Sequence, residues 1–120
     1  MQNHIELGKA GEMIAIGHLE AQGYRILEKN WRWGRNEIDI IAQHDAITVI
    51  VEVKTRRSNQ FCEPESAVMK GKQRILINAA NAWVRYRKSP GEVRFDVITV
   101  VIGTRGHALN HIVDAFYATM

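Results

Sequence analysis

Residues 37–54 have the sequence EIDIIAQHDAITVIVEVK, which is two apolar segments separated by a short polar stretch. Their alternation and β-branched residues predict two strands, and the few residues between them suffice only for a tight hairpin. Asp39 lies on the first strand, and Glu52 and Lys54 lie on the second. Side chains alternate across a strand, so Glu52 and Lys54 share one face. The hairpin therefore predicts that two acids and one lysine converge.

The position of the turn decides how the two acids meet. A turn centred on Asp45-Ala46 places Asp39 directly opposite Glu52, with about 5 Å between Cβ atoms. A turn centred on His44-Asp45 places Asp39 opposite Ile50, and the diagonal to Glu52 is then about 7 to 8 Å. Either distance allows a divalent cation to be shared, whereas a one-residue slip to another register separates the carboxylates.

Composition indicates an ordinary globular protein. The chain has 120 residues, 46% hydrophobic and 24% charged, so we expect a single domain over residues 1–120. We find neither a signal-peptide core nor an apolar segment of membrane-spanning length, and we therefore expect a cytoplasmic protein without a membrane partner. The single cysteine, Cys62, excludes an internal disulfide and is expected to be an incidental thiol. His107 and His111 lie four apart in a predicted strand or turn, which argues against a zinc pair.

Hydrophobic periodicity and turn residues predict the order α-β-β-β-α-β. A helix that crosses between two strands usually makes them parallel neighbours, so we predict a three-layer α/β domain with a mixed central sheet. The expected elements are a helix over residues 6–22 ended by Gly23, a strand over 24–30, a loop over 31–36, strands over 37–43 and 46–56, a helix from Pro64 to Tyr86, a strand over 94–102 and a candidate short edge strand over 108–113.

The triplet Glu52-Val53-Lys54 is weak evidence by itself, because alternating charges on a strand usually form a solvated face. Here the strand is too apolar for an exposed edge, and buried charges need a partner or a metal. We therefore interpret Asp39 and Glu52 as metal ligands. Lys54 would orient the attacking water or offset charge in the transition state of phosphodiester cleavage.

Two further acids are candidates for the same site. Glu12 lies on the first predicted helix, where Gly8 and Gly11 would let the helix approach the sheet closely. Glu12 is then a third ligand, or else an acid that interacts with the helix dipole. Glu37 shares a face with Asp39 and would either reach a second metal or pair with a neighbouring arginine.

The net charge of +3 favours a nucleic-acid partner only weakly, but the distribution of basic residues says more. Several groups lie beside the acids in the predicted topology, where they would hold phosphates. Lys72 and Gln73, beyond Gly71, would contact a phosphate or a bound water, or would form an exposed polar helix face. The candidate substrate-binding residues are Arg32, Arg35, Arg56, Arg57 and Gln73.

Aromatic residues are interleaved with arginines in one segment of the chain. Trp31, Trp33 and Tyr24 have a composition suited to stacking bases, although packing of at least one tryptophan in the core is the simpler interpretation. Arg94 and Asp96 share a face of the predicted strand over 94–102. They are expected to form an ion pair that braces the sheet, with a supporting role near the acids as the alternative.

Taken jointly, the order and spacing of these motifs resemble the YraN-like family of uncharacterised bacterial proteins. That family belongs to the restriction-endonuclease-like superfamily and is similar to Holliday-junction resolvases. The resemblance spans nearly the whole chain, and Asn36 departs from it where the family often has glycine. The residues that carry it are Gly8-x-x-Gly11-Glu12, Asn30-x-Arg32, Glu37-Ile38-Asp39-Ile40-Ile41-Ala42, Val51-Glu52-Val53-Lys54-x-Arg56, Lys72-x-x-Arg74-Ile75 and Arg94-Phe95-Asp96-Val97.

The resemblance implies a restriction-endonuclease-like α/β/α fold and a nuclease that depends on Mg²⁺ or Mn²⁺. It assigns Asp39, Glu52 and Lys54 as the catalytic acid, acid and lysine, with Glu12 as the first-helix acid and Lys72 or Gln73 as a further polar group. We therefore expect a metal-dependent endodeoxyribonuclease acting on branched or damaged DNA, with a homodimer as one option. The alternatives are a nucleic-acid-binding protein that retains the fold without catalysis, and a scaffold whose charged hairpin packs against a partner.

Overall fold

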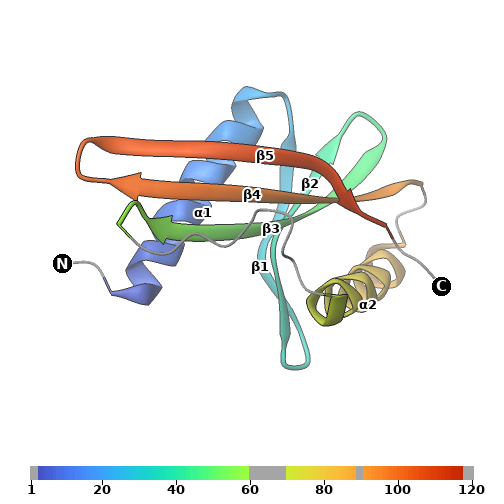
Figure 1. The fold of residues 1–120 in the computed structure, drawn as a ribbon. Coiled ribbons are helices and arrows are strands. Elements are labelled where there is room, and N and C mark those ends of the chain that lie inside the picture. Colours follow the sequence, from blue (N-terminus) through green and yellow to red (C-terminus); the bar gives the residue numbers. More distant parts are fainter. Residues whose placement is uncertain (1–2, 60–69, 89–90, 118–120) are drawn as a thin grey trace.

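The computed structural model describes residues 3–59, 70–88 and 91–117 (Figure 1). The protein is of the α/β class, and its helices and strands follow the predicted order, with the candidate edge strand present at the end. Cys62 and Pro64, for which we made predictions, lie outside the described residues. The elements are α1 (His4–Ala21), β1 (Arg25–Trp33), β2 (Asn36–His44), β3 (Ile47–Arg57), α2 (Lys70–Arg87), β4 (Val93–Gly103) and β5 (Gly106–Phe116).

The five strands form one mixed sheet in the order β1-β2-β3-β4-β5. Only the central pair, β3 and β4, is parallel, and the other three pairs are antiparallel. The parallel pair is the one that follows the crossover through α2, as the sequence predicted. Neither helix within the described ranges combines the length and the apolar character needed to cross a membrane.

Two hydrophobic clusters show that α1 and α2 cover opposite faces of the sheet. Leu19 of α1 packs in a cluster with Ile40, Val49 and Val51. Trp83 of α2 packs in a second cluster, which includes Ile50 from the same β3 strand. Neighbouring residues of one strand thus point to opposite helices, which is the alternation expected of a sheet buried on both faces. The described residues therefore form the predicted three layers.

Helix α1 lies very close to β3 at one point. A Cβ atom at Gly11 would collide with the side chain of Thr55, so no larger residue fits there without movement. Gly8, by contrast, has open space around it. Of the two glycines expected to permit close approach, only Gly11 is needed for it. This contact fixes the height of Glu12, the next residue of the helix, above the sheet.

A network of charged and polar side chains is buried between α1 and the sheet. Arg94 donates two hydrogen bonds of 2.9 Å to Asp96 and one of 2.6 Å to the Tyr24 hydroxyl. His111 lies 2.7 Å from the same carboxylate and 3.1 Å from His18. The predicted ion pair that braces the sheet is confirmed. Burial would raise the pKa of Asp96, but hydrogen bonds from His111, Arg94 and the Asp114 amide outweigh burial and lower it.

Two predicted boundaries are wrong. The expected loop over residues 31–36 is almost entirely strand, because β1 and β2 continue to the pair Trp33 and Asn36 and leave only Gly34 and Arg35 in the turn. Gly34 has φ of +63°, which a tight hairpin turn of this kind requires at its first position. The candidate short strand over 108–113 is part of the full-length β5, which pairs with β4 along most of its length.

Candidate metal and nucleic-acid site

The hairpin of β2 and β3 has the first of the two registers considered. His44 pairs with Ile47, so the turn is Asp45-Ala46, and the pairing continues to Ile40 and Val51. The next opposed residues in this register are Asp39 and Glu52. The ladder ends before them, and the Asp39 carboxylate instead accepts a hydrogen bond of 2.8 Å from the Val53 amide. Asp39 therefore lies where β2 separates from β3.

The alternation of side chains along β2 breaks at Asp39. Ile38 and Ile41 both pack in the cluster beside α2, whereas Ile40 packs beside α1. Strict alternation would place Ile38 and Ile40 on the same face, so the strand rotates locally between them. As a result, Asp39 turns toward α1. The prediction that Asp39 and Glu37 share a face holds, but that face is not the one that carries Glu52 and Lys54.

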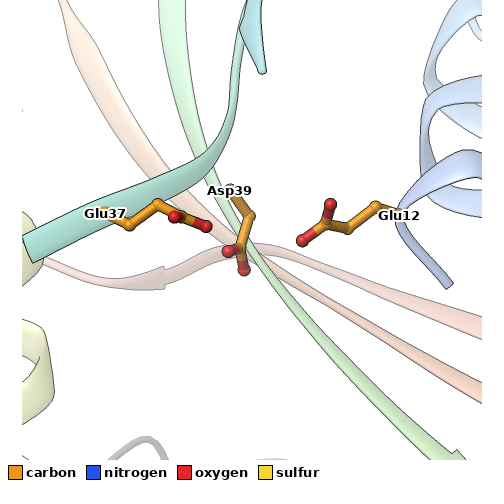
Figure 2. Close-up of side chains that lie close together, drawn as sticks. All are labelled: Glu12, Glu37 and Asp39. Carbon is orange, nitrogen blue, oxygen red and sulfur yellow. The ribbon is translucent and has the colours of Figure 1, made fainter. Parts of the chain in front are cut away.

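Three carboxylates from two elements meet at this point. Glu37 and Asp39 come from β2, and Glu12 reaches toward them from α1 (Figure 2). One oxygen of each carboxylate lies within 4.8 Å of the others, and all three side chains are half-buried. We call these three residues the acidic cluster. It is the one group of three or more potential metal-binding side chains found in residues 3–59, 70–88 and 91–117, and it could hold a metal ion.

Asn30 orients one member of the acidic cluster. It lies opposite Asp39 in the pairing of β1 with β2, and its amide donates a hydrogen bond of 3.2 Å to Glu12. Its φ of +52° is in the left-handed region, which asparagine tolerates better than most residues. From the sequence we assign no functional role to Asn30. Two signals pointed to this residue: its place in the Asn30-x-Arg32 motif of the family resemblance, and its position within a strand segment, where asparagine is uncommon.

Two members of the acidic cluster hold their protons more tightly than free carboxylic acids do. Burial, a hydrogen bond with Glu52 and the charge of Glu52 raise the pKa of Asp39 to about 8, although the Val53 amide and Lys72 favour the carboxylate. Burial and then the charges of Asp39 and Glu37 raise the pKa of Glu12 to about 7. A bound cation would relieve this repulsion and favour the ionised acids.

Glu52 approaches Asp39 from the other face of the sheet. It is buried, its carboxyl group shares a hydrogen bond with Asp39, and it lies 3.4 Å from the Lys72 ammonium at the start of α2. Lys54 is half-buried two residues further along the same face of β3, and Gln73 is half-buried beside Lys72. The structure thus brings Asp39, Glu52 and Lys72 together, but Glu52 is not part of the acidic cluster.

The candidate substrate-binding arginines lie in two places. Arg32 and Arg35 are exposed at the end of the β1–β2 hairpin, and Arg32 lies 3.5 Å from Glu37 of the acidic cluster. The predicted alternative of a salt bridge between Glu37 and a neighbouring arginine is therefore confirmed. Arg56 and Arg57 are half-buried at the end of β3. Basic side chains thus lie beside the acids on β1 and beyond them on β3.

The three aromatic residues proposed for base stacking separate in the structure. Tyr24 is buried, hydrogen-bonded to Arg94 and stacked on His44 at a ring distance of 4.1 Å, so it cannot stack on a base. Trp31 packs against the core beside α2. Trp33 is 40% exposed. Of the three, only Trp33 is exposed.

Comparison with known proteins identifies the family of this chain. The profile of the Uncharacterised protein family UPF0102 matches residues 11–100, which include every residue of the acidic cluster, Glu52, Lys54 and Lys72. A UPF0102 protein from Flavobacterium johnsoniae is 45% identical, with 98% of each chain covered. Relatives from Bacteroides thetaiotaomicron and Flavobacterium psychrophilum are each 44% identical over 98% of this chain and 97% and 98% of their own lengths. The chain therefore belongs to the uncharacterised protein family UPF0102.

Proposed function

We propose that this protein is a divalent-metal-dependent endonuclease that hydrolyses phosphodiester bonds of DNA, including branched or damaged DNA. The observation that carries the proposal is the position of Asp39 at the fork between β2 and β3. There, one carboxylate lies between Glu12 and Glu37 on one side and Glu52 on the other. Few purely structural roles would favour four acids around one point, because their mutual repulsion opposes folding.

The donor set fits Mg²⁺ or Mn²⁺ better than a softer ion. Glu12, Glu37 and Asp39 offer only carboxylate oxygens, which hard cations prefer. Oxygen-rich sites with several half-buried carboxylates also leave room for water and for a phosphate oxygen. A cation bound there would supply electrostatic stabilisation of the phosphoryl oxygens and a more acidic bound water.

The remaining side chains would position the substrate. Lys72 of α2 lies 3.4 Å from Glu52, and Lys54 is two residues beyond Glu52 on β3. Both ammonium groups would contact the phosphate undergoing attack. Arg32, Arg35, Arg56 and Arg57 would bind neighbouring phosphates and hold the strand in register with the acids. Asn30 would keep Glu12 directed toward Asp39.

One contact favours a second candidate, a DNA-binding protein that does not cleave. Lys72 lies 3.4 Å from Glu52 and neutralises that buried acid without a metal. If this ion pair is permanent, Glu52 is unavailable as a ligand, and the basic residues alone would bind DNA.

The two candidates are separated by incubating plasmid, linear, single-stranded and four-way-junction DNA with the protein in Mg²⁺ or Mn²⁺. The variants are Asp39→Asn, Glu52→Gln and Lys54→Met, and the control is Glu20→Gln, which alters an exposed acid at the far end of α1. Cleavage that chelator abolishes, that falls at least about 100-fold in the three variants and that persists in the control supports the nuclease. DNA binding without cleavage in all five proteins would reject it in favour of the binder.

A further inference from the structure

The β1–β2 hairpin ends in an exposed tip close to the acidic cluster. Its turn contains only Gly34 and Arg35, and it projects away from β3, β4 and β5 (Figure 1). A Cβ atom at Gly34 would meet no other part of the described chain within 4 Å, so the tip is open to solvent. Trp33, the last residue of β1, is 40% exposed there. A single exposed ring is common on protein surfaces, so its meaning depends on the side chains around it.

The two faces of this hairpin differ in chemistry. Arg32 and Glu37 are opposed in the pairing and form an ion pair, and Glu37 belongs to the acidic cluster. Trp31 and Trp33 alternate with Arg32 and point to the other face, where Trp31 packs beside α2. One face thus leads to the acids, and the opposite face is aromatic.

A residue of α2 extends the aromatic face. The ring of Tyr86 lies 6.3 Å from that of Trp31, and 70% of Tyr86 is exposed. Trp31 and Tyr86 are thus neighbours, and Trp33 lies two residues beyond Trp31 on the same face of β1, so the three aromatic residues share one side of the hairpin. Arg32 has a 75% exposed side chain, and Arg35 is exposed in the turn. Accessible rings flanked by guanidinium groups match the chemistry of a nucleic-acid strand, whose bases stack and whose phosphates are anionic.

The distance between the rings and the acids suits a single strand. Trp33 is three residues beyond Asn30, which lies opposite Asp39, so the two levels are about 10 Å apart along β1. The rings and the acids lie on opposite faces of the hairpin, so a single strand would reach both by passing around the outer edge of β1, the edge strand of the sheet. In an intact duplex the faces of the bases are covered by their neighbours, so an aromatic ring can stack only on an unpaired or terminal base.

We propose that Trp33 and Tyr86, supported by Trp31, form a stacking site for unpaired DNA bases next to the phosphate held at the acidic cluster. This inference rests on the proposed function and narrows its substrate class to DNA with a single-stranded segment, as at a branch, flap or gap. Arg32 and Arg35 bind the phosphates of that segment.

The test measures affinity for a fluorescein-labelled single-stranded oligonucleotide and for the duplex of the same sequence, with the full chain in EDTA so that cleavage does not intervene. The variants are Trp33→Ala, Trp33→Phe and Tyr86→Ala. Tyr117→Ala is the matched control, because Tyr117 is an aromatic residue beyond the end of β5 with 66% exposure. Thermal unfolding checks that each variant is folded.

We expect Trp33→Ala and Tyr86→Ala each to weaken single-strand binding by about 5- to 100-fold and duplex binding by less than about twofold. Trp33→Phe should retain most of the affinity, and Tyr117→Ala all of it. Equal losses for single strand and duplex, or no loss in either alanine variant, would overturn the stacking site. A wild type that is a dimer, together with a Trp33→Ala variant that is a monomer, would also overturn it, because the ring would then pack against a second copy of the chain. Retained cleavage in Asp39→Asn would refute the proposed nuclease site. It would leave the affinities measured for the Trp33 and Tyr86 variants unaffected.

Discussion

Replacement of Asp39 by asparagine tests the electrostatics of the site without requiring activity. The side chain keeps its shape, and its carbonyl oxygen can still accept the hydrogen bond that Asp39 accepts from the Val53 amide. The negative charge is lost. We expect Asp39→Asn to stabilise the metal-free protein at alkaline pH relative to the wild type, and to abolish stabilisation by Mg²⁺ or Mn²⁺.

The magnitude follows from the pKa of Asp39, which burial and the neighbouring Glu52 raise from 3.8 to about 8. Because the folded pKa is above the unfolded one, the contribution of Asp39 to stability is fully present below pH of about 4 and is lost as pH rises toward 8. Each pKa unit corresponds to about 1.4 kcal/mol, so the difference between these two pKa values sets a ceiling of roughly 6 kcal/mol. Relaxation around this half-buried group lowers the figure, and we expect about 1 to 3 kcal/mol.

The assay is urea denaturation at several pH values between 4 and 9, in EDTA, for the wild type and Asp39→Asn. We compare the two free energies of unfolding as the value for the variant minus the value for the wild type. This difference should increase by about 1 to 3 kcal/mol between pH 4 and pH 8. Addition of Mg²⁺ at pH 8 should stabilise the wild type but not Asp39→Asn. Glu20→Gln is the control for loss of an exposed acid. A difference that is flat or decreases with pH would refute the electrostatic reasoning.

Two further predictions concern stability. Gly11→Ala should destabilise the fold by about 1 to 3 kcal/mol in urea denaturation, because its Cβ atom would collide with Thr55. The matched variant Gly8→Ala has open space and should be neutral or stabilising by up to about 1 kcal/mol, so equal effects would contradict the close approach of α1. Asp96→Asn should destabilise the fold by about 3 kcal/mol at pH 7, because the part-buried guanidinium of Arg94 would lose its charged partner. Since the pKa of Asp96 is lowered, its contribution should disappear as pH falls below about 4, and a loss independent of pH would argue against the ion pair.

The central hairpin could be predicted because its signals are local. Two β-branched segments separated by a short polar stretch allow few registers, and the observed one was among the two considered. The crossover through α2 then gave the parallel pairing of β3 with β4. The ion pair of Arg94 with Asp96 followed from two charges on one face of an apolar strand, where an unpaired charge is costly.

The face of Asp39 could not be predicted from periodicity. The alternation of side chains between the two faces of β2 changes between Ile38 and Ile41. This change lies opposite Asn30 of β1, whose backbone is in the left-handed region. The sequence of β2 alone contains no pattern that indicates this pairing. Tyr24 was misassigned for a similar reason. Its aromatic ring and adjacent arginine suggested a binding surface, but its hydroxyl contacts Arg94, 70 residues away in the chain. Such long-range polar contacts leave no periodic signal in one sequence.

The symmetric turn at Asp45-Ala46 has a consequence for how this chain tolerates insertions and deletions. Asp39 and Glu52 are equally far from that turn, so residues added within the turn lengthen a solvent-exposed loop and leave the two acids opposed. Deletion of one residue inside β2 or β3 shifts the register by one residue, so the two acids are no longer opposed. Every side chain beyond the deletion then points to the other face of the sheet. Length variation among working versions of this protein should therefore be confined to the turn.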